Sequence, residues 1–145
     1  MKKYIALLLI LYTVLFAGCS SKTSVDESDM DVVDLTSLSS TMVYAEVNNM
    51  MTNPEKYIGK TIKMSGTCYN EFIFGIGTYH YVIIEDATAC CAQGMEFIWN
   101  GEHINTVDYP KEQAKIEVTG IFDSYEKFDG IRYYILADDI SILNE

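Results

Sequence analysis

The spacing of hydrophobic residues changes along the chain, and the change separates one helix from a series of strands. In the segment STMVYAEVNNMM, residues 40–51, the apolar side chains recur at the spacing of one helix face. These side chains are Val43, Val47, Met50 and Met51. Pro54 ends the helix, because the residue before a proline is disfavoured in helical geometry. We therefore expect a helix at 40–51, followed by one short turn that closes at Gly59.

From residue 60 onward, apolar and polar positions alternate, which predicts strands. Five segments carry this pattern, at residues 60–69, 79–86, 95–99, 114–125 and 131–140. The Asp129-Gly130 pair between the last two segments is typical of a hairpin turn. Gly66 and Gly120 interrupt the first and fourth segments, and a glycine inside a strand often marks a bend. The pattern predicts a mainly β domain whose sheet bends until it closes on itself.

The order of these motifs resembles that of small exported OB-fold domains of bacteria. The matching residues are P-x-x-Y-x-G-K-x-I-x-x-S-G from Pro54 to Gly66, the hairpin that follows, and IEVTGIF at 116–122. The resemblance implies an N-terminal helix followed by a five-stranded OB-fold-like Greek-key barrel. A fold of this kind does not by itself assign a function.

The N-terminus has the order of an export signal. Lys2 and Lys3 precede an apolar run at 4–16, which is shorter than the roughly 20 residues of a membrane-spanning helix. The segment LFAGC, ending at Cys19, resembles the lipobox of bacterial lipoproteins. That resemblance implies that Cys19 becomes the N-terminus and carries acyl chains such as palmitate. Two such chains give stable attachment to a membrane.

These features predict three parts of the chain and a location. Residues 1–18 form a lipoprotein signal peptide, residues 19–40 form a lipidated, disordered tether rich in Ser and Asp, and residues 41–145 form the OB-fold-like domain. The protein is expected on the extracytoplasmic face of the cell membrane, where the lipid anchor makes the membrane itself a partner.

The charge of the chain predicts which partners it avoids. The formal net charge is −11, and removing the signal peptide would make it more negative because that segment carries lysines and no acidic residue. Binding to a phosphate backbone needs the opposite sign, so we expect no nucleic-acid partner. Aromatic residues gather around the first hairpin, at Tyr69, Phe72, Phe74, Tyr79 and Tyr81. They are expected to pack the barrel and its loops, or to form a platform for an envelope protein, a peptide or a saccharide.

Three cysteines remain for the folded domain. Cys90 and Cys91 are neighbours, and their α-carbons are about 3.8 Å apart across a trans peptide, closer than a disulfide prefers. Cys68 lies on the core side of the first strand. Small exported domains commonly use cysteine for disulfides. We therefore predict a disulfide between Cys68 and either Cys90 or Cys91.

A metal site is the alternative use of these thiols. Its ligands would be Cys68, Cys90, Cys91 and His80. The chain lacks the Cys-x2-4-Cys spacing of structural zinc sites. The double-cysteine stretch is also similar to one in bacterial membrane proteins associated with zinc uptake, which implies zinc or copper handling.

The sequence contains no recognisable catalytic motif. It has no Gly-x-Ser-x-Gly, no His-Glu-x-x-His and no Cys-x-x-Cys. We therefore predict a non-catalytic binding or accessory module of the cell envelope that needs no cofactor. Metal handling and thiol redox chemistry are the alternatives.

Overall fold

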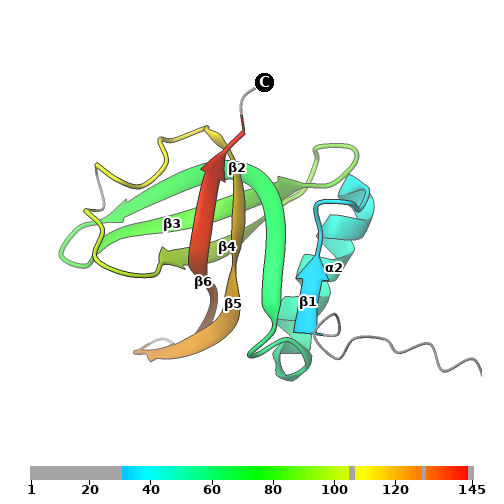
Figure 1. Cartoon of the computed structure of the whole chain (residues 1–145), viewed down its shortest axis with the longest axis horizontal. Coiled ribbons are helices and arrows are strands. Elements are labelled where there is room, and N and C mark those ends of the chain that lie inside the picture. The colour runs from blue at the N-terminus through cyan, green and yellow to red at the C-terminus, as the bar shows by residue number, and fades with distance from the viewer. Residues whose placement is uncertain (1–30, 105–106, 129, 144–145) are drawn as a thin grey trace, which may run out of the picture.

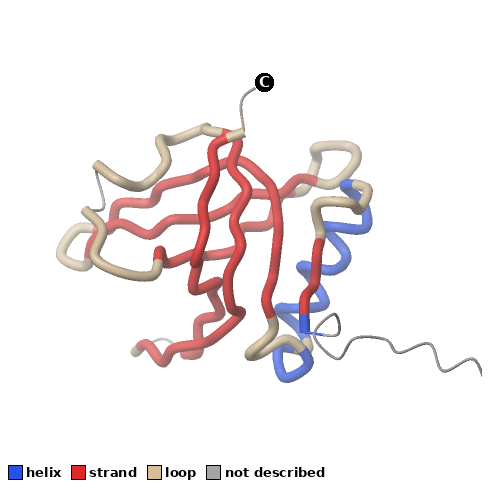
Figure 2. The backbone as a smooth tube through the Cα atoms, viewed as in Figure 1, coloured by secondary structure: helices blue, strands red, loops and turns tan. Residues whose placement is uncertain are grey.

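The computed structural model describes residues 31–104, 107–128 and 130–143, and the predicted signal peptide and Cys19 lie outside this part. Within these residues the chain forms one α-helix, one short 3-10 helix and six strands, arranged as Figures 1 and 2 show. In chain order these are β1 (Val32–Asp34), α2 (Ser40–Thr52), η2 (Pro54–Lys56), β2 (Thr61–Ile73), β3 (Gly77–Glu85), β4 (Ala92–Trp99), β5 (Lys115–Lys127) and β6 (Gly130–Ile142). Among these described residues, no helix is long and apolar enough to cross a membrane.

The pairing of the strands confirms the predicted OB-fold-like barrel. Strand β2 pairs with β5 through its first half and with β3 through its second half, so this one strand joins the two ends of the barrel sheet. Strand β4 pairs with β3 on one side and, in parallel, with β6 on the other. Strands β5 and β6 form a long antiparallel hairpin that completes the circuit. This order is that of the five-stranded Greek-key OB-fold barrel.

Two glycines allow the sheet to bend, as the sequence predicts. A Cβ atom at Gly66 would lie 2.5 Å from the carbonyl oxygen of Ile83. A Cβ atom at Gly120 would lie 2.1 Å from the carbonyl oxygen of Leu136, where the β5–β6 register shifts. Real Cβ atoms do not approach other atoms so closely, so both positions need glycine because strands cross tightly there.

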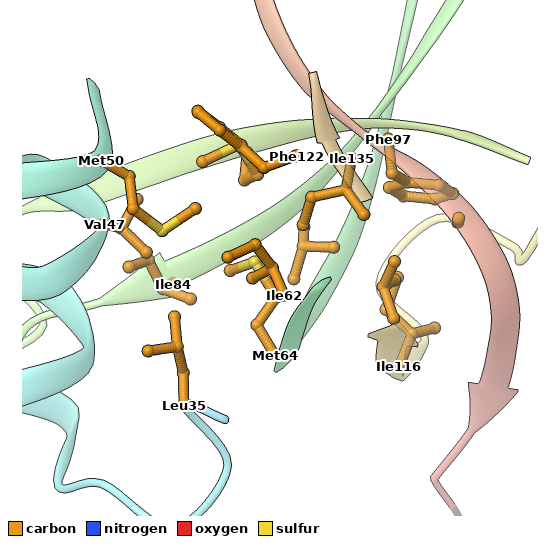
Figure 3. Packing of buried hydrophobic residues seen from close by; sticks show 14 of the residues in the cluster. Leu35, Val47, Met50, Ile62, Met64, Ile84, Phe97, Ile116, Phe122 and Ile135 are labelled. Carbon is orange, nitrogen blue, oxygen red and sulfur yellow. The ribbon is translucent and has the colours of Figure 1, made fainter. Parts of the chain in front are cut away.

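The core lies inside the barrel and continues under α2 (Figure 3). Alternate residues of β2 and β5 point inward, so that Ile62, Met64 and Val118 are fully buried. Helix α2 closes one end of the barrel with Val47 and Met50. Met51, which was expected on the same face, is 41% exposed because it lies at the edge of the buried stripe.

The end of the predicted tether is part of the folded domain. Strand β1 pairs in parallel with the start of β2, and the Leu35 amide donates a hydrogen bond to the Lys63 carbonyl at 2.8 Å. The Leu35 side chain is only 2% exposed and joins the core beside α2 (Figure 3). The domain therefore begins near residue 32 instead of 41, because a buried leucine holds this segment against the barrel.

Candidate functional site

Two hairpins project from the barrel toward the same side, away from α2 (Figure 1). The β2–β3 hairpin turns through Gly75 and Gly77, whose φ angles of +80° and +132° are strained for other residues. Its apolar side chains point into solvent instead of into the core. The exposed fractions are 71% for Phe72, 93% for Phe74 and 51% for Ile76. Exposed apolar groups in such a cluster are typical of an interaction site.

The β5–β6 hairpin brings positive charge to these aromatic residues. The Lys127 ammonium lies 4.0 Å from the centre of the Tyr79 ring, within the range of a cation–π interaction. Phe128 is 88% exposed at the tip of this hairpin. A cavity of about 420 Å³ between the hairpins is lined by Tyr79, Tyr81, Lys127, Phe128 and Arg132, among others. We call the surface made by Phe74, Ile76, Tyr79, Tyr81, Lys127, Phe128 and Arg132 the hairpin face.

A row of polar and aromatic side chains crosses the strands beside the hairpin face. Glu96 on β4 lies directly opposite Tyr81 on β3 and Tyr134 on β6. The Tyr125 hydroxyl approaches both carboxylate oxygens of Glu96, at 2.9 and 3.1 Å. The Tyr125 ring packs edge-on against Tyr134, with the centroids 5.5 Å apart. Residues far apart in the sequence therefore meet here because four strands, β3, β4, β6 and β5, run side by side.

The electrostatics of this row keep a proton on the tyrosine and disfavour the ionised carboxylate. Burial raises the pKa of Glu96, although the Tyr125 hydrogen bond and the charge of Arg132 partly oppose the effect. Burial and the nearby Glu96 carboxylate raise the pKa of Tyr125. Tyr125 is therefore a hydrogen-bond donor at neutral pH.

Cys68 and His80 lie together in the interior, away from the other two thiols. The His80 Nδ1 atom is 2.7 Å from the Asn70 side-chain oxygen, and its ring stacks on Tyr109 with centroids 3.8 Å apart. The Cys68 thiol donates to the same Asn70 oxygen at 3.4 Å. Burial, more than the charge of Glu112, raises the pKa of Cys68 to about 11. Cys68 is thus a buried thiol and a poor nucleophile.

Cys90 and Cys91 lie in the exposed turn between β3 and β4. Their Sγ atoms are 3.5 Å apart, and the backbone amides of both residues donate to the Asp86 carboxylate. Cys68, Cys90 and Cys91 are all free, so the structure does not form the predicted disulfide. It also divides the four ligands of the predicted metal site into two pairs, with Cys68 and His80 in the interior and Cys90 and Cys91 in the exposed turn. Within the described residues, Asp86, Cys90 and Cys91 are the group whose ligand atoms lie close enough together, within 4.8 Å, to share an ion.

Comparisons with known proteins extend the description of the fold. No family model and no curated protein matches the chain. The N-terminal domain of the PriB protein from Thermoanaerobacter tencongensis is similar in structure, with 14% identity and a TM-score of 0.43, over 59% of this chain and 97% of that one. The mitochondrial single-stranded DNA binding protein Rim1 from S. cerevisiae is similar at 16% identity and a TM-score of 0.43, over 59% of this chain and 93% of that one.

Two predictions from the sequence are corrected here. The partner prediction, which excluded nucleic acid and favoured an envelope protein, peptide or saccharide, is overturned by a structural neighbour that is a single-stranded DNA binding protein. The same finding overturns the predicted function as an envelope accessory module, with metal handling and thiol redox chemistry as its alternatives. The physical reason is that net charge averages over the chain, whereas Lys127 and Arg132 are placed beside the aromatic residues of one face.

Proposed function

We propose that this protein binds single-stranded nucleic acid on the hairpin face and catalyses no reaction. The observation that supports the proposal most directly is the placement of Lys127 against Tyr79, at 4.0 Å, among exposed aromatic side chains of both hairpins. OB-folds bind oligonucleotides on the outer side of the second and third barrel strands, which are β3 and β4 in this protein. This surface lies between the two hairpins. Bases stack on aromatic rings with little dependence on sequence.

Stacking, rather than charge, is expected to supply most of the affinity. The hairpin face carries two cations, Lys127 and Arg132, while Glu71 lines the same cavity. The chain as a whole has a net charge of −11. Each phosphate neutralised on a single strand contributes about −0.7 to the slope of log K against log salt, so two contacts give at most about −1.4. A stacking-dominated site therefore loses little affinity between low and moderate salt.

Fluorescence anisotropy with a labelled thymine oligonucleotide of roughly 15 nucleotides tests the proposal, because OB-folds occupy about 4–16 nucleotides. Phe74→Ala and Phe128→Ala each remove one exposed ring. We expect each to weaken binding about 5- to 150-fold, the equivalent of about 1–3 kcal/mol per stacked base. Met42→Ala is the matched control, because this residue is 55% exposed on α2, away from the hairpins.

The two lysine variants separate the hairpin face from general electrostatics. Lys127→Ala is expected to weaken binding and reduce the salt slope, whereas Lys56→Ala, on η2, is expected to change neither. If both variants lost the same affinity for the oligonucleotide, positive charge anywhere on the surface would be enough to explain binding. Absence of any oligonucleotide binding, or binding of an oligosaccharide at this face in its place, would refute the proposal.

We also propose that Cys19 is acylated and holds the domain at the extracytoplasmic face of the membrane. The supporting features are Lys2 and Lys3, the apolar run and the LFAGC segment. The nucleic acid met by the domain would then be outside the cytoplasm. Mass spectrometry of the N-terminal peptide tests this directly. A precursor that retains residues 1–18, with an unmodified thiol at Cys19, would refute it.

A further inference from the structure

The carboxylate of Glu96 is an unusual group to find buried beside a proposed binding face. The residue is 6% exposed, although glutamate is rarely buried without full pairing. The hydrogen bonds that the structure gives it both come from the single Tyr125 hydroxyl. A carboxylate offers about four acceptor sites, and one hydroxyl hydrogen cannot fill them. The side chain therefore has acceptor capacity that a ligand could use.

Glu96 also lines a cavity that is suited to a flat ring. The cavity has a volume of about 290 Å³, at the lower end of the range for small-molecule pockets. Its other walls are largely aromatic and aliphatic, and include Ile76, Tyr79, Phe97, Tyr109 and Tyr125. Ile76 and Tyr79 also line the cavity between the hairpins, so a strand lying on the hairpin face passes next to this cavity.

The chemistry of the cavity selects among the bases. A buried carboxylate accepts hydrogen bonds and donates none while it is ionised. Guanine presents two neighbouring N–H donors on its Watson–Crick edge, which match the two oxygens of a carboxylate. Thymine presents one N–H donor between two carbonyl oxygens, which would repel the carboxylate. Charge-assisted, bidentate hydrogen bonds are among the strongest in proteins.

We propose that Glu96 and its cavity accept a guanine base, so that the protein prefers single strands that contain guanine. This inference rests on the proposed function, because it assumes that a strand lies on the hairpin face. A good bidentate contact discriminates against the wrong base by about 1–3 kcal/mol, which corresponds to about 5- to 150-fold in affinity.

Thymine oligonucleotides that carry guanine, inosine or adenine at one central position test the preference. Inosine keeps the N1–H donor of guanine and lacks its exocyclic amino group, so it removes one of the two proposed bonds. We expect the guanine strand to bind most tightly, the inosine strand to bind less tightly, and the adenine and all-thymine strands to bind most weakly. Equal affinity for guanine and inosine strands would overturn the bidentate contact without any change to the protein.

The variant Glu96→Gln replaces one acceptor with a donor at the same position. We expect it to lose the preference for guanine, because the guanine strand binds more weakly while the all-thymine strand, relieved of the repulsion by the carboxylate, binds at least as tightly as before. Glu71→Gln is the matched control, because that exposed carboxylate lines the neighbouring cavity, and it should keep the preference. If all strands bind equally to the unmodified protein, the guanine site is refuted and the proposed function stands. If no strand binds, the proposed function itself fails.

Discussion

Substitution of Gly120 by alanine tests the close crossing of strands on which the barrel depends. The new Cβ would lie 2.1 Å from the Leu136 carbonyl oxygen and 2.6 Å from the Ala137 α-carbon. Both are backbone atoms of the paired strand β6, so no side-chain rotation can relieve the contact. Since real Cβ atoms keep at least 3.0 Å from such atoms, β5 and β6 must separate locally by about 1 Å.

The expected loss is about 2–3 kcal/mol in the free energy of unfolding, at the upper end of the cost of overpacking a well-packed interior. For a domain of this size, each kcal/mol lowers the melting temperature by about 4–8 °C. Gly120→Ala should therefore melt about 10 °C or more below the unmodified protein. The same displacement moves the β5–β6 hairpin that carries Lys127, so oligonucleotide binding should weaken as well.

Gly94→Ala is the matched control for this experiment. Gly94 also lies within a strand, and the nearest atom to a Cβ there is the flexible end of the Ile83 side chain, at 3.0 Å. We expect this variant to unfold within about 0.5 kcal/mol of the unmodified protein, because Ile83 can move aside. Urea and thermal unfolding of both variants give the comparison. Equal stability of the Gly120 and Gly94 variants would show that Gly120 does not mark an obligatory close crossing.

Three further predictions concern other parts of the domain. Leu35→Ala should lower the free energy of unfolding by about 2–5 kcal/mol in urea titrations, because this buried side chain belongs to the core, and a change below about 0.5 kcal/mol would make the β1 segment a loose tether. Burial raises the pKa of Glu96, so the free energy of unfolding should decline as the pH rises from 4.5, the ordinary pKa of glutamate, through the pKa of Glu96 in the folded protein. Glu96→Gln should remove this decline in unfolding experiments carried out across pH, and an unchanged pH profile would contradict the prediction. A thiol reagent should modify the exposed Cys90 and Cys91 well before Cys68, whose buried thiol has a pKa of about 11, and mass spectrometry that finds a disulfide in the unreduced protein would contradict the free thiols.

The local pattern of the sequence predicted most of the fold. Alternation located the five barrel strands, and the helical spacing of Val47 and Met50 identified the helix face that closes the barrel. Gly66 and Gly120 marked the two bends of the sheet. These predictions succeed because strand and helix periods, and the absence of a side chain at glycine, act within a few residues of the chain.

Features that depend on distant contacts were missed or misjudged. The composition of a segment rich in Ser and Asp predicted a tether. The burial of Leu35 depends on the barrel against which it packs, and the local sequence does not reveal that contact. The predicted disulfide joined cysteines that the structure places in the core and in an exposed turn. The spacing of Cys68 and Cys90 along the chain did not indicate their distance in space, because that distance depends on strand register.

The candidate site shows the same division. The sequence by itself determined that aromatic residues such as Phe72 and Tyr79 gather around the first hairpin, and it determined a strongly acidic chain. Only the tertiary structure placed Lys127 over Tyr79, and Tyr125 against a buried Glu96, by bringing the β5–β6 hairpin beside β3 and β4. Composition adds charges without regard to position. Salt screens Coulomb interactions over about 8–10 Å, and stacking needs contact between the rings, so the barrel topology decides what this face can bind.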